Sequence, residues 1–475
     1  MYSALRACLL LLMLMGSAGA VRAEEPPPSP SVRLVPNSFI GRTGFIRVVQ
    51  DAGKRWWLVT PDGKPFFYKA ATALNRSGRS GGRRAKPGPY SETVDRKYDY
   101  SKSPQAFVQA SIKKLQLWGF NALGSWTTEE FFEQGMPYTE IVEFNYVGPK
   151  IKLEGVAGAS VDLPDVLDPA WERVADEKAR QICTPRRGSR DLVGYFTDNE
   201  LGWAQPAASS KDDNPAAPTA QKAGLTLLQQ CLCLPPDQGA YKAAWAFSLA
   251  RHKGDPAAVA RAWGITSAAP ADILAMTKAS EALVSRGYRE DCSKFSEQLA
   301  QRYFETTARL IRKYDPNHLI LGCRFGAPPG SAILAACRRP WVDVLSANNY
   351  RDTMFERIDE YYLPTKMPIL IGEFAWSSGY FTREIESEDP IVKALPVPER
   401  AARRGEASLR RAAAHPGLVG YTWYRWVSAW DKTDPKAMPY GLVDTNDDPI
   451  GLHTVRLSQL NPALTGIHAR GSAAK

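Results

Sequence analysis

Eight short apolar segments recur along the chain, and most of them are separated by helical patterns. They span residues 66–73, 120–124, 139–144, 192–197, 319–323, 342–347, 368–371 and 418–422. Strands buried on both faces have this continuous apolar character, and repeated strand–helix units are typical of a parallel α/β sheet. Eight such units predict a closed (β/α)8 TIM barrel. An open doubly wound sheet is the alternative, although no G-x-G-x-x-G motif follows the first strand.

Helix-start signals stand between the predicted strands. Ser103-Pro104 and Asp168-Pro169 each place an N-cap residue before a first-turn proline. Two amphipathic patterns, over residues 295–314 and 398–414, predict further helices that cover the sheet.

The length of 475 residues on its own suggests two or three domains, yet the strand pattern favours one enlarged barrel. Turn signals at residues 51–53 and 61–63 predict a small antiparallel β motif before the first barrel strand. The expected organisation is an N-terminal β motif over 32–64, a barrel over 65–465 with a helical insertion over 203–290 after strand four, and a flexible tail over 466–475.

The first 23 residues have the features of a secretory signal peptide. An apolar run over residues 7–15 is followed by small residues with an A-x-A pattern at Ala18 and Ala20. The run is about half of the ~20 residues that span a bilayer, so a retained membrane anchor is the weaker alternative. We expect a secreted or periplasmic protein with a Pro-rich linker over 24–31 and no stable membrane anchor after cleavage.

The composition is that of a soluble globular chain, with 44% hydrophobic and 23% charged residues, and it excludes collagen-like, coiled-coil and wholly disordered classes. The formal net charge of +10 is mild for this length. Five basic residues and no acidic ones lie in the segment 75–86 after strand one. This segment is read as a flexible solvated loop, with binding of an anionic glycan as the alternative. Nucleic acid is a poor partner for an exported chain.

Metal and cofactor signals are weak. The chain has 5 His and no H-E-x-x-H or C-x-x-C spacing, so a zinc site and other cofactors are not expected. The six cysteines beyond the predicted signal peptide allow disulfides, but their pairing cannot be deduced from the sequence.

Two glutamates stand where the chemistry of such barrels takes place. Glu200 follows strand four in Thr197-Asp-Asn-Glu200, and Glu373 ends strand seven in Ile369-Leu-Ile-Gly-Glu373. Active sites of these barrels lie at the C-terminal ends of the strands. Each Glu alone could be a helix-cap or first-turn charge. Two carboxylates across one cleft suit glycoside hydrolysis, in which one protonates the leaving oxygen and the other attacks the anomeric carbon.

The ordered set of motifs resembles the clan A retaining glycoside hydrolases, and within them the agarase and β-galactosidase-like branch. The resemblance rests on Asn199-Glu200, Glu373 and the segments 56–67, 118–121, 314–325 and 441–444, and it covers most of the chain after residue 23. It implies that Glu200 is the general acid/base and Glu373 the nucleophile.

The resemblance also implies substrate-binding positions by strand. Asn199 would bind the sugar 2-hydroxyl, and Tyr350 would hold Glu373 through its hydroxyl. Trp423 or Trp426 would form the sugar platform. Asn348 and Asn349 would adjust the sugar contacts, and the other expected contacts are Arg324, Trp376 and Trp126. Aromatic rings suit these positions because a pyranose has an apolar C–H face, although ordinary packing is the alternative for each.

The leading hypothesis is therefore a secreted or periplasmic retaining β-glycosidase that acts on a β-linked poly- or oligosaccharide, with an anionic substrate left open. A non-catalytic carbohydrate-binding barrel of the bacterial envelope and a cationic polyanion-binding protein are the alternatives. Loops set specificity, so the sugar, the linkage and exo or endo action stay open. A long insertion that walls off one end of the cleft would favour exo action.

Overall fold

The structure, a computed structural model, describes residues 32–81, 86–152, 162–203, 226–265, 285–382, 395–428 and 438–472. The predicted signal peptide and linker lie outside the described residues, as do parts of the basic segment and of the predicted insertion. The description below concerns residues 32–472.

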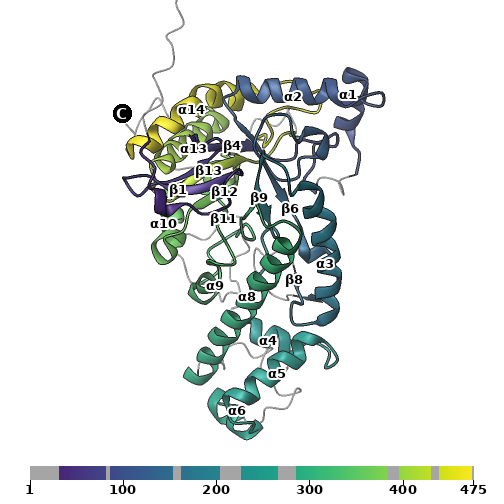
Figure 1. The fold of residues 1–475 in the computed structure, drawn as a ribbon, viewed down its shortest axis with the longest axis vertical. Helices are drawn as coiled ribbons and strands as arrows, with labels where there is room; N and C mark the ends of the chain where they lie inside the picture. Colours follow the sequence, from purple (N-terminus) through teal and green to yellow (C-terminus); the bar gives the residue numbers. More distant parts are fainter. Residues whose placement is uncertain are drawn as a thin grey trace, which may run out of the picture. The chain divides into compact units, whose positions relative to one another are not determined.

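The fold is mixed α/β around a curled parallel sheet of eight strands (Figure 1). All eight predicted strands are present in it. In spatial order they are β10 (Leu319–Ile320), β9 (Leu192–Phe196), β6 (Tyr138–Ile141), β5 (Ala122–Leu123), β4 (Tyr68–Ala71), β13 (Leu418–Trp423), β12 (Ile369–Phe374) and β11 (Leu345–Asn348). Backbone hydrogen bonds also join the segments at the two ends of this order, where Phe325 N donates to Ser346 O at 3.0 Å. Every pair of neighbouring strands runs parallel, so the C-terminal ends of all strands meet at one edge.

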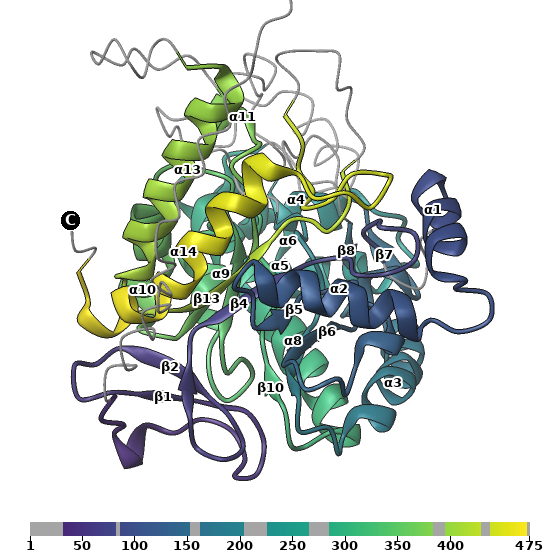
Figure 2. The ribbon, with the colours of Figure 1, turned by 90° about the horizontal axis from the view of Figure 1, so that it is seen from above.

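Helices lie around this sheet (Figures 1 and 2). They include α1 (Pro89–Tyr98), α2 (Gln105–Leu117), α3 (Pro169–Cys183), α8 (Arg286–Tyr314), α9 (Ser331–Ala336), α10 (Met354–Thr365), α13 (Val397–Ala413) and α14 (Gly451–Arg470). The predicted start signal at Asp168 is confirmed, because its carboxylate accepts a hydrogen bond from Ala170 N at 2.8 Å. An N-cap of this kind satisfies a backbone donor that the helix itself leaves free.

Between β9 and β10 the described residues form three further helices before α8. These are α4 (Leu227–Leu232), α5 (Gly239–Arg251) and α6 (Pro256–Trp263), and all of them pack against α8 (Figure 1). Their described residues line neither of the two cavities described in the next subsection. The expectation that this part of the chain walls off the cleft therefore has no support from the described residues.

The apolar core forms two layers. Val193, Leu319, Leu370 and Val419 belong to an inner cluster enclosed by the curled sheet. A larger outer cluster lies between the sheet and the helices and contains Leu418, Tyr421 and Trp423 among others. Successive side chains of a strand point to opposite faces, which is why neighbours such as Leu418 and Val419 enter different layers.

The predicted N-terminal β motif is present as an antiparallel sheet of β1 (Arg47–Gln50), β2 (Trp56–Val59) and β3 (Pro65–Phe66). Its Val48 and Leu58 join the inner cluster, and Trp56 N donates to Pro416 O at 2.8 Å just before β13 begins. The motif therefore packs at the N-terminal ends of the strands and leaves the opposite edge for a site.

The expected flexible tail over 466–475 is wrong for its first residues. Helix α14 continues to Arg470, and the two ring nitrogens of the fully buried His468 lie 2.9 Å from the acceptors Ala413 O and Trp56 O. Ring contacts with Trp57 and Phe67 add to this anchoring. The six described cysteines are all free thiols.

Candidate active site

Glu200 and Glu373 line one cavity of about 580 Å³. Glu373 lies within β12, and Glu200 follows β9 where that strand ends at Phe196. Tyr350, which follows β11, lines the same cavity. The prediction that the two carboxylates and this tyrosine converge is confirmed, because the C-terminal ends of parallel strands meet at one edge.

The carboxylate of Glu373 is almost fully buried and is held from both sides. Arg324 Nη2 donates to its Oε1 at 2.7 Å, and the Tyr350 hydroxyl donates to its Oε2. Burial raises the pKa of Glu373 to about 7, while Arg324 and Tyr350 oppose the rise and the charge of Glu200 adds to it. Glu373 thus has two donors that stabilise its ionised form, although burial makes ionisation at this position unfavourable.

Arg324 is fully buried, and its position is built by its neighbours. It donates to Gly372 O at 3.0 Å as well as to Glu373, and its guanidinium lies 4.6 Å from the ring centre of Trp126 and 5.2 Å from that of Phe196. These are cation–π contacts. A Cβ on Gly372 would come within 2.7 Å of Arg324 Nε. The glycine before Glu373 therefore leaves the space that the Arg324 side chain occupies.

Glu200 has different surroundings. Its side chain is half-buried, and its Oε1 accepts a hydrogen bond from Asn348 Nδ2 at 2.7 Å. The backbone at Glu200 is left-handed, with φ at 49°, and its N–H donates to Arg324 O at 3.1 Å. A non-glycine residue in this conformation is strained, and such strain is often found at functional sites.

Asn348 connects the two halves of the site. Its Nδ2 contacts Glu200 and also Asn199 Oδ1 at 3.2 Å, and it lies opposite Glu373 in the register of β11 and β12. Asn199 itself lines a second cavity of about 230 Å³, next to Trp126. Ser80 of this second cavity donates to the hydroxyl of Tyr424 in the first at 3.3 Å, so the two cavities adjoin.

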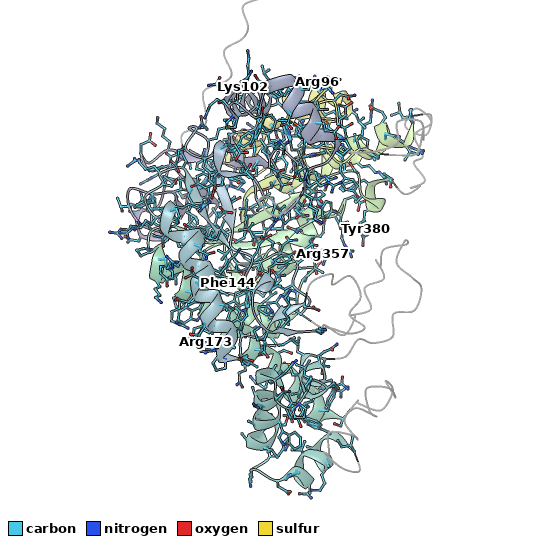
Figure 3. All side chains as sticks on the ribbon, turned by 90° about the vertical axis from the view of Figure 1, so that its right-hand side faces the viewer. Arg96, Lys102, Phe144, Arg173, Arg357 and Tyr380 are labelled. Atoms are coloured by element: carbon cyan, nitrogen blue, oxygen red, sulfur yellow. The ribbon has the colours of Figure 1, made fainter. Side chains whose placement is uncertain are left out.

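The remaining wall of the first cavity consists mainly of tyrosines. Tyr424 packs edge-to-face on Tyr350 and on Tyr440, with ring centres 6.1 Å apart in both pairs. Tyr380 and Arg425 line the same wall (Figure 3 labels Tyr380). Aromatic rings and hydroxyls around two carboxylates are suited to a sugar, which has both apolar and hydroxylated surfaces.

Three of the predicted tryptophans do not reach the cavity, and their expected role as sugar contacts is wrong. Trp423, Trp426 and Trp376 are fully buried in the outer core. Their indole N–H groups donate to Tyr440 O, the Tyr90 hydroxyl and His453 Nδ1. Strand alternation points Trp423 toward the helices and turns the next residue, Tyr424, toward the cavity.

Two further expectations are corrected by local geometry. The side chain of Asn349 folds back on its own loop, where its Oδ1 accepts a hydrogen bond from Arg351 N, and its neighbour Asn348 contacts Asn199 and Glu200 instead. Arg324 is fully buried and contacts the Glu373 carboxylate, so it positions Glu373 and has no surface for a sugar.

Asp198, close to Glu200 in sequence, is also fully buried. Its carboxylate accepts hydrogen bonds from Asn145 N and the Tyr303 hydroxyl, and burial raises its pKa to about 8. It is a structural residue.

The basic segment 75–86 is partly described. Arg76 forms an ion pair with Asp95 on α1 through Nε and Nη2, and Arg79 is exposed. The residues in between, Ser77 and Gly78, form a turn on Asn75. The sequence analysis missed Tyr424, Tyr440, Tyr380 and Arg425 as residues of the site, and only the strand alternation around Trp423 could have indicated Tyr424.

Neither a metal cluster nor a membrane-spanning helix is found in the described part of the chain. No group of three or more His, Cys, Asp or Glu side chains there is arranged to hold a metal ion. No helix in those same residues is long and apolar enough to cross a membrane.

The fold and the paired carboxylates are of the kind found in glycoside hydrolases, and comparison with known proteins supports this class. No family model matches the chain. In sequence it is 26% identical over 399 residues to beta-agarase A of Vibrio sp. (strain JT0107), covering 77% of this chain and 36% of the relative. It is 24% identical over 373 residues to beta-agarase B of the same strain, covering 76% and 36%. The chain therefore spans about a third of the length of these relatives.

Solved structures show the same fold. One described as an exo-beta-agarase superposes with a TM-score of 0.70 at 19% identity, covering 92% of this chain and 69% of its own. The agarase AgWH50C superposes with a TM-score of 0.67 at 21% identity, covering 90% and 67%. The resemblance to agarases predicted from the sequence is confirmed.

Proposed function

We propose that this protein is a glycoside hydrolase that cleaves β-linked polysaccharide or its oligosaccharides, with agarase-like activity. The observation that carries the proposal is the pair of unlike carboxylates in one cavity: Glu373 buried against Arg324 and Tyr350, and Glu200 half-buried beside Asn348. Hydrolysis of a glycosidic bond needs two carboxyl groups in different environments. The sequence similarity to beta-agarases A and B supports a galactan as the substrate.

The mechanism that fits these contacts is a double displacement. The Glu373 carboxylate attacks the anomeric carbon while Glu200 gives its proton to the departing glycosidic oxygen, which leaves a glycosyl-enzyme ester and an ionised Glu200. Glu200 then takes a proton from water as the water attacks the same carbon, and Glu373 leaves as the carboxylate. Arg324 and Tyr350 hold Glu373 as an anion at the start and stabilise it again as the leaving group.

The two glutamates have surroundings that suit these separate roles. A nucleophile must be ionised and fixed, and Glu373 is the carboxylate with a cationic donor and a hydroxyl donor. An acid/base must exchange protons with solvent, and Glu200 is the more exposed of the two. The resemblance to clan A retaining enzymes assigns the same roles.

The proposal includes a closed (β/α)8 barrel and an exported chain. Closure is supported by the parallel bridge between Phe325 and Ala347, which joins the segment after β10 to β11. Export to the periplasm or the medium is supported by the signal-peptide pattern of the first 23 residues. N-terminal sequencing of protein recovered outside the cytoplasm tests the second point.

The function is tested by incubating the purified chain with agarose, other β-linked polysaccharides and their oligosaccharides, followed by chromatography of the products. The expected result is release of saccharides from agarose-type chains, and the Glu373→Gln variant is the matched control for contaminating activity. Tight binding of an oligosaccharide without release of any product by the wild type would contradict the proposal and favour a binding barrel.

A further inference from the structure

Arg425 is a cation of the candidate active site that has no anionic partner among the described residues. It is half-buried and lines the same cavity as Glu200 and Glu373. Its Nε donates a hydrogen bond to Val427 O at 2.9 Å, and its guanidinium lies 5.7 Å from the ring centre of Tyr424. Within the described ranges, no carboxylate forms an ion pair with Arg425, whereas the other arginine of the site, Arg324, is paired with Glu373.

The position of Arg425 argues against a role in neutralising the catalytic pair. The charges and donors that set the pKa of Glu373 are mainly those of Arg324, Glu200 and Tyr350, and Arg425 is not among them. Its neighbours on the cavity wall, Tyr424 and Tyr440, are uncharged donors and acceptors. The guanidinium is therefore not one of the groups that hold the Glu373 carboxylate.

The hydrogen bond to Val427 O also fixes how Arg425 is presented. A guanidinium has five N–H donors in a rigid plane, and the bond from Nε uses one of them. The four donors on the two terminal nitrogens remain, in the geometry that binds an oxyanion through two parallel hydrogen bonds. An arginine side chain that is already fixed before the ligand arrives loses less conformational entropy on binding.

We infer that Arg425 recognises an anionic group on the sugar, a carboxylate or a sulfate ester, so that the preferred substrate is an acidic β-linked glycan. This rests on the proposed function and adds to it the chemical class of the substrate. A neutral sugar would leave the cation with only weaker hydroxyl partners, whereas an oxyanion would form charge-assisted hydrogen bonds, which are about twice as strong as neutral ones.

The test compares three aryl glycosides that share one leaving group: the 4-nitrophenyl β-D-galactoside, its 6-carboxylate and its 6-sulfate. In the wild type, we expect kcat/KM to be at least about tenfold higher for one of the acidic glycosides, and which of the two is preferred separates carboxylate from sulfate. Arg425→Gln should lower kcat/KM for that acidic glycoside about 10- to 100-fold and change the neutral one less than about threefold. Arg425→Lys should retain an intermediate value.

Arg96→Gln is the matched control, because Arg96 is exposed on α1 (Figure 3) and its loss removes the same charge outside the cavity. It should change none of the three values. Equal losses on all three glycosides in Arg425→Gln, or a wild-type preference for the neutral glycoside, would overturn the inference while leaving the proposed function intact.

Calorimetric binding of the methyl β-glycosides of the same three sugars gives a readout that does not depend on turnover. We expect the acidic glycoside to bind more tightly than the neutral one at low salt, to lose affinity as salt is added, and to lose most of its advantage in Arg425→Gln. Unchanged binding of the acidic glycoside by Arg425→Gln would overturn the inference even if none of the three aryl glycosides is hydrolysed.

Discussion

The carboxylates of Glu373 and Glu200 differ in their burial and in the donors that surround them. Glu373 is buried within a strand and accepts hydrogen bonds from a fully buried arginine and a tyrosine. Glu200 is half-buried on a left-handed residue after a strand and accepts from an uncharged amide. The first environment fixes an anion in one place, and the second leaves a proton free to move. The two locations therefore suit the two different roles that the proposed mechanism gives to the same residue type.

Removing each carboxylate in turn gives the largest effect and the sharpest contrast. Glu373→Ala should lower kcat by about 10⁵-fold or more on every substrate, because no other group replaces the nucleophile. Glu200→Ala should cost about 10²–10⁴-fold on substrates with poor leaving groups and far less on aryl glycosides, whose leaving groups need little protonation. Steady-state rates with an oligosaccharide and an aryl glycoside measure both.

Azide separates the same two variants by stereochemistry. In Glu373→Ala it should restore turnover and give the glycosyl azide of inverted configuration, because azide attacks in place of the nucleophile. In Glu200→Ala it should give the retained configuration, because azide attacks the glycosyl-enzyme. Retained product from Glu373→Ala would reverse the assignment.

Removing a group that donates a hydrogen bond to Glu373 should give the next largest effect. The pH dependence of kcat/KM then shows whether that group acts through Glu373. Burial raises the pKa of Glu373 to about 7, and the ionised form is the active one in the proposed mechanism, so wild-type kcat/KM should fall as the pH drops below about 7. Arg324 lowers this pKa, so Arg324→Met should raise it further and move the acid limb to higher pH. Activity at pH 7 should drop about 10²–10³-fold by loss of a buried charge-assisted contact and recover partly as the pH increases. An unshifted limb would contradict a positioning role for Arg324.

Tyr350→Phe should act in the same direction with a smaller magnitude. The variant keeps the ring contact with Tyr424 and removes the hydroxyl that donates to Glu373. We expect a decrease of roughly tenfold in kcat, as for loss of one hydrogen bond to a charged group, with a small upward shift of the acid limb. A change in KM alone would show that the hydroxyl contacts substrate and does not hold Glu373.

Trp423→Phe should have the smallest effect on catalysis and a clear one on stability. Trp423 is fully buried and its indole donates to Tyr440 O at 2.9 Å, so the smaller ring leaves a cavity and an unpaired carbonyl. The melting temperature should fall, by an amount corresponding to about 1–3 kcal/mol, with kcat changed little at low temperature. Tyr424→Ala is the matched variant, since the neighbouring side chain lines the cavity and its loss should raise KM instead.

The sequence predicted the architecture well because buried parallel strands leave a direct signal. Each of the eight predicted strands lies in the sheet, and the residues at their C-terminal ends, Glu200, Arg324, Tyr350 and Glu373, converge as expected. That convergence depends only on strand order and direction, which a repeated apolar pattern specifies.

The direction of individual side chains could not be predicted, because it depends on local register. The pairing of β11 with β12 shifts between Ala347 and Asn348, and that of β12 with β13 shifts twice. A shift of one residue exchanges the faces of a strand. This is why Asn348 and not Asn349 contacts Glu200. At the end of β13 the ordinary alternation of the strand places Tyr424 and not Trp423 at the cavity.

The identity of the nucleophile is tested most directly by trapping the glycosyl-enzyme. The protein is incubated with a 2-deoxy-2-fluoro-β-glycosyl fluoride, digested, and its peptides are sequenced by mass spectrometry. The account predicts one added fluorosugar, with loss of fluoride, on the peptide that contains Glu373 and on that residue. A label on Glu200, or an unlabelled protein that releases product of inverted configuration, would contradict it.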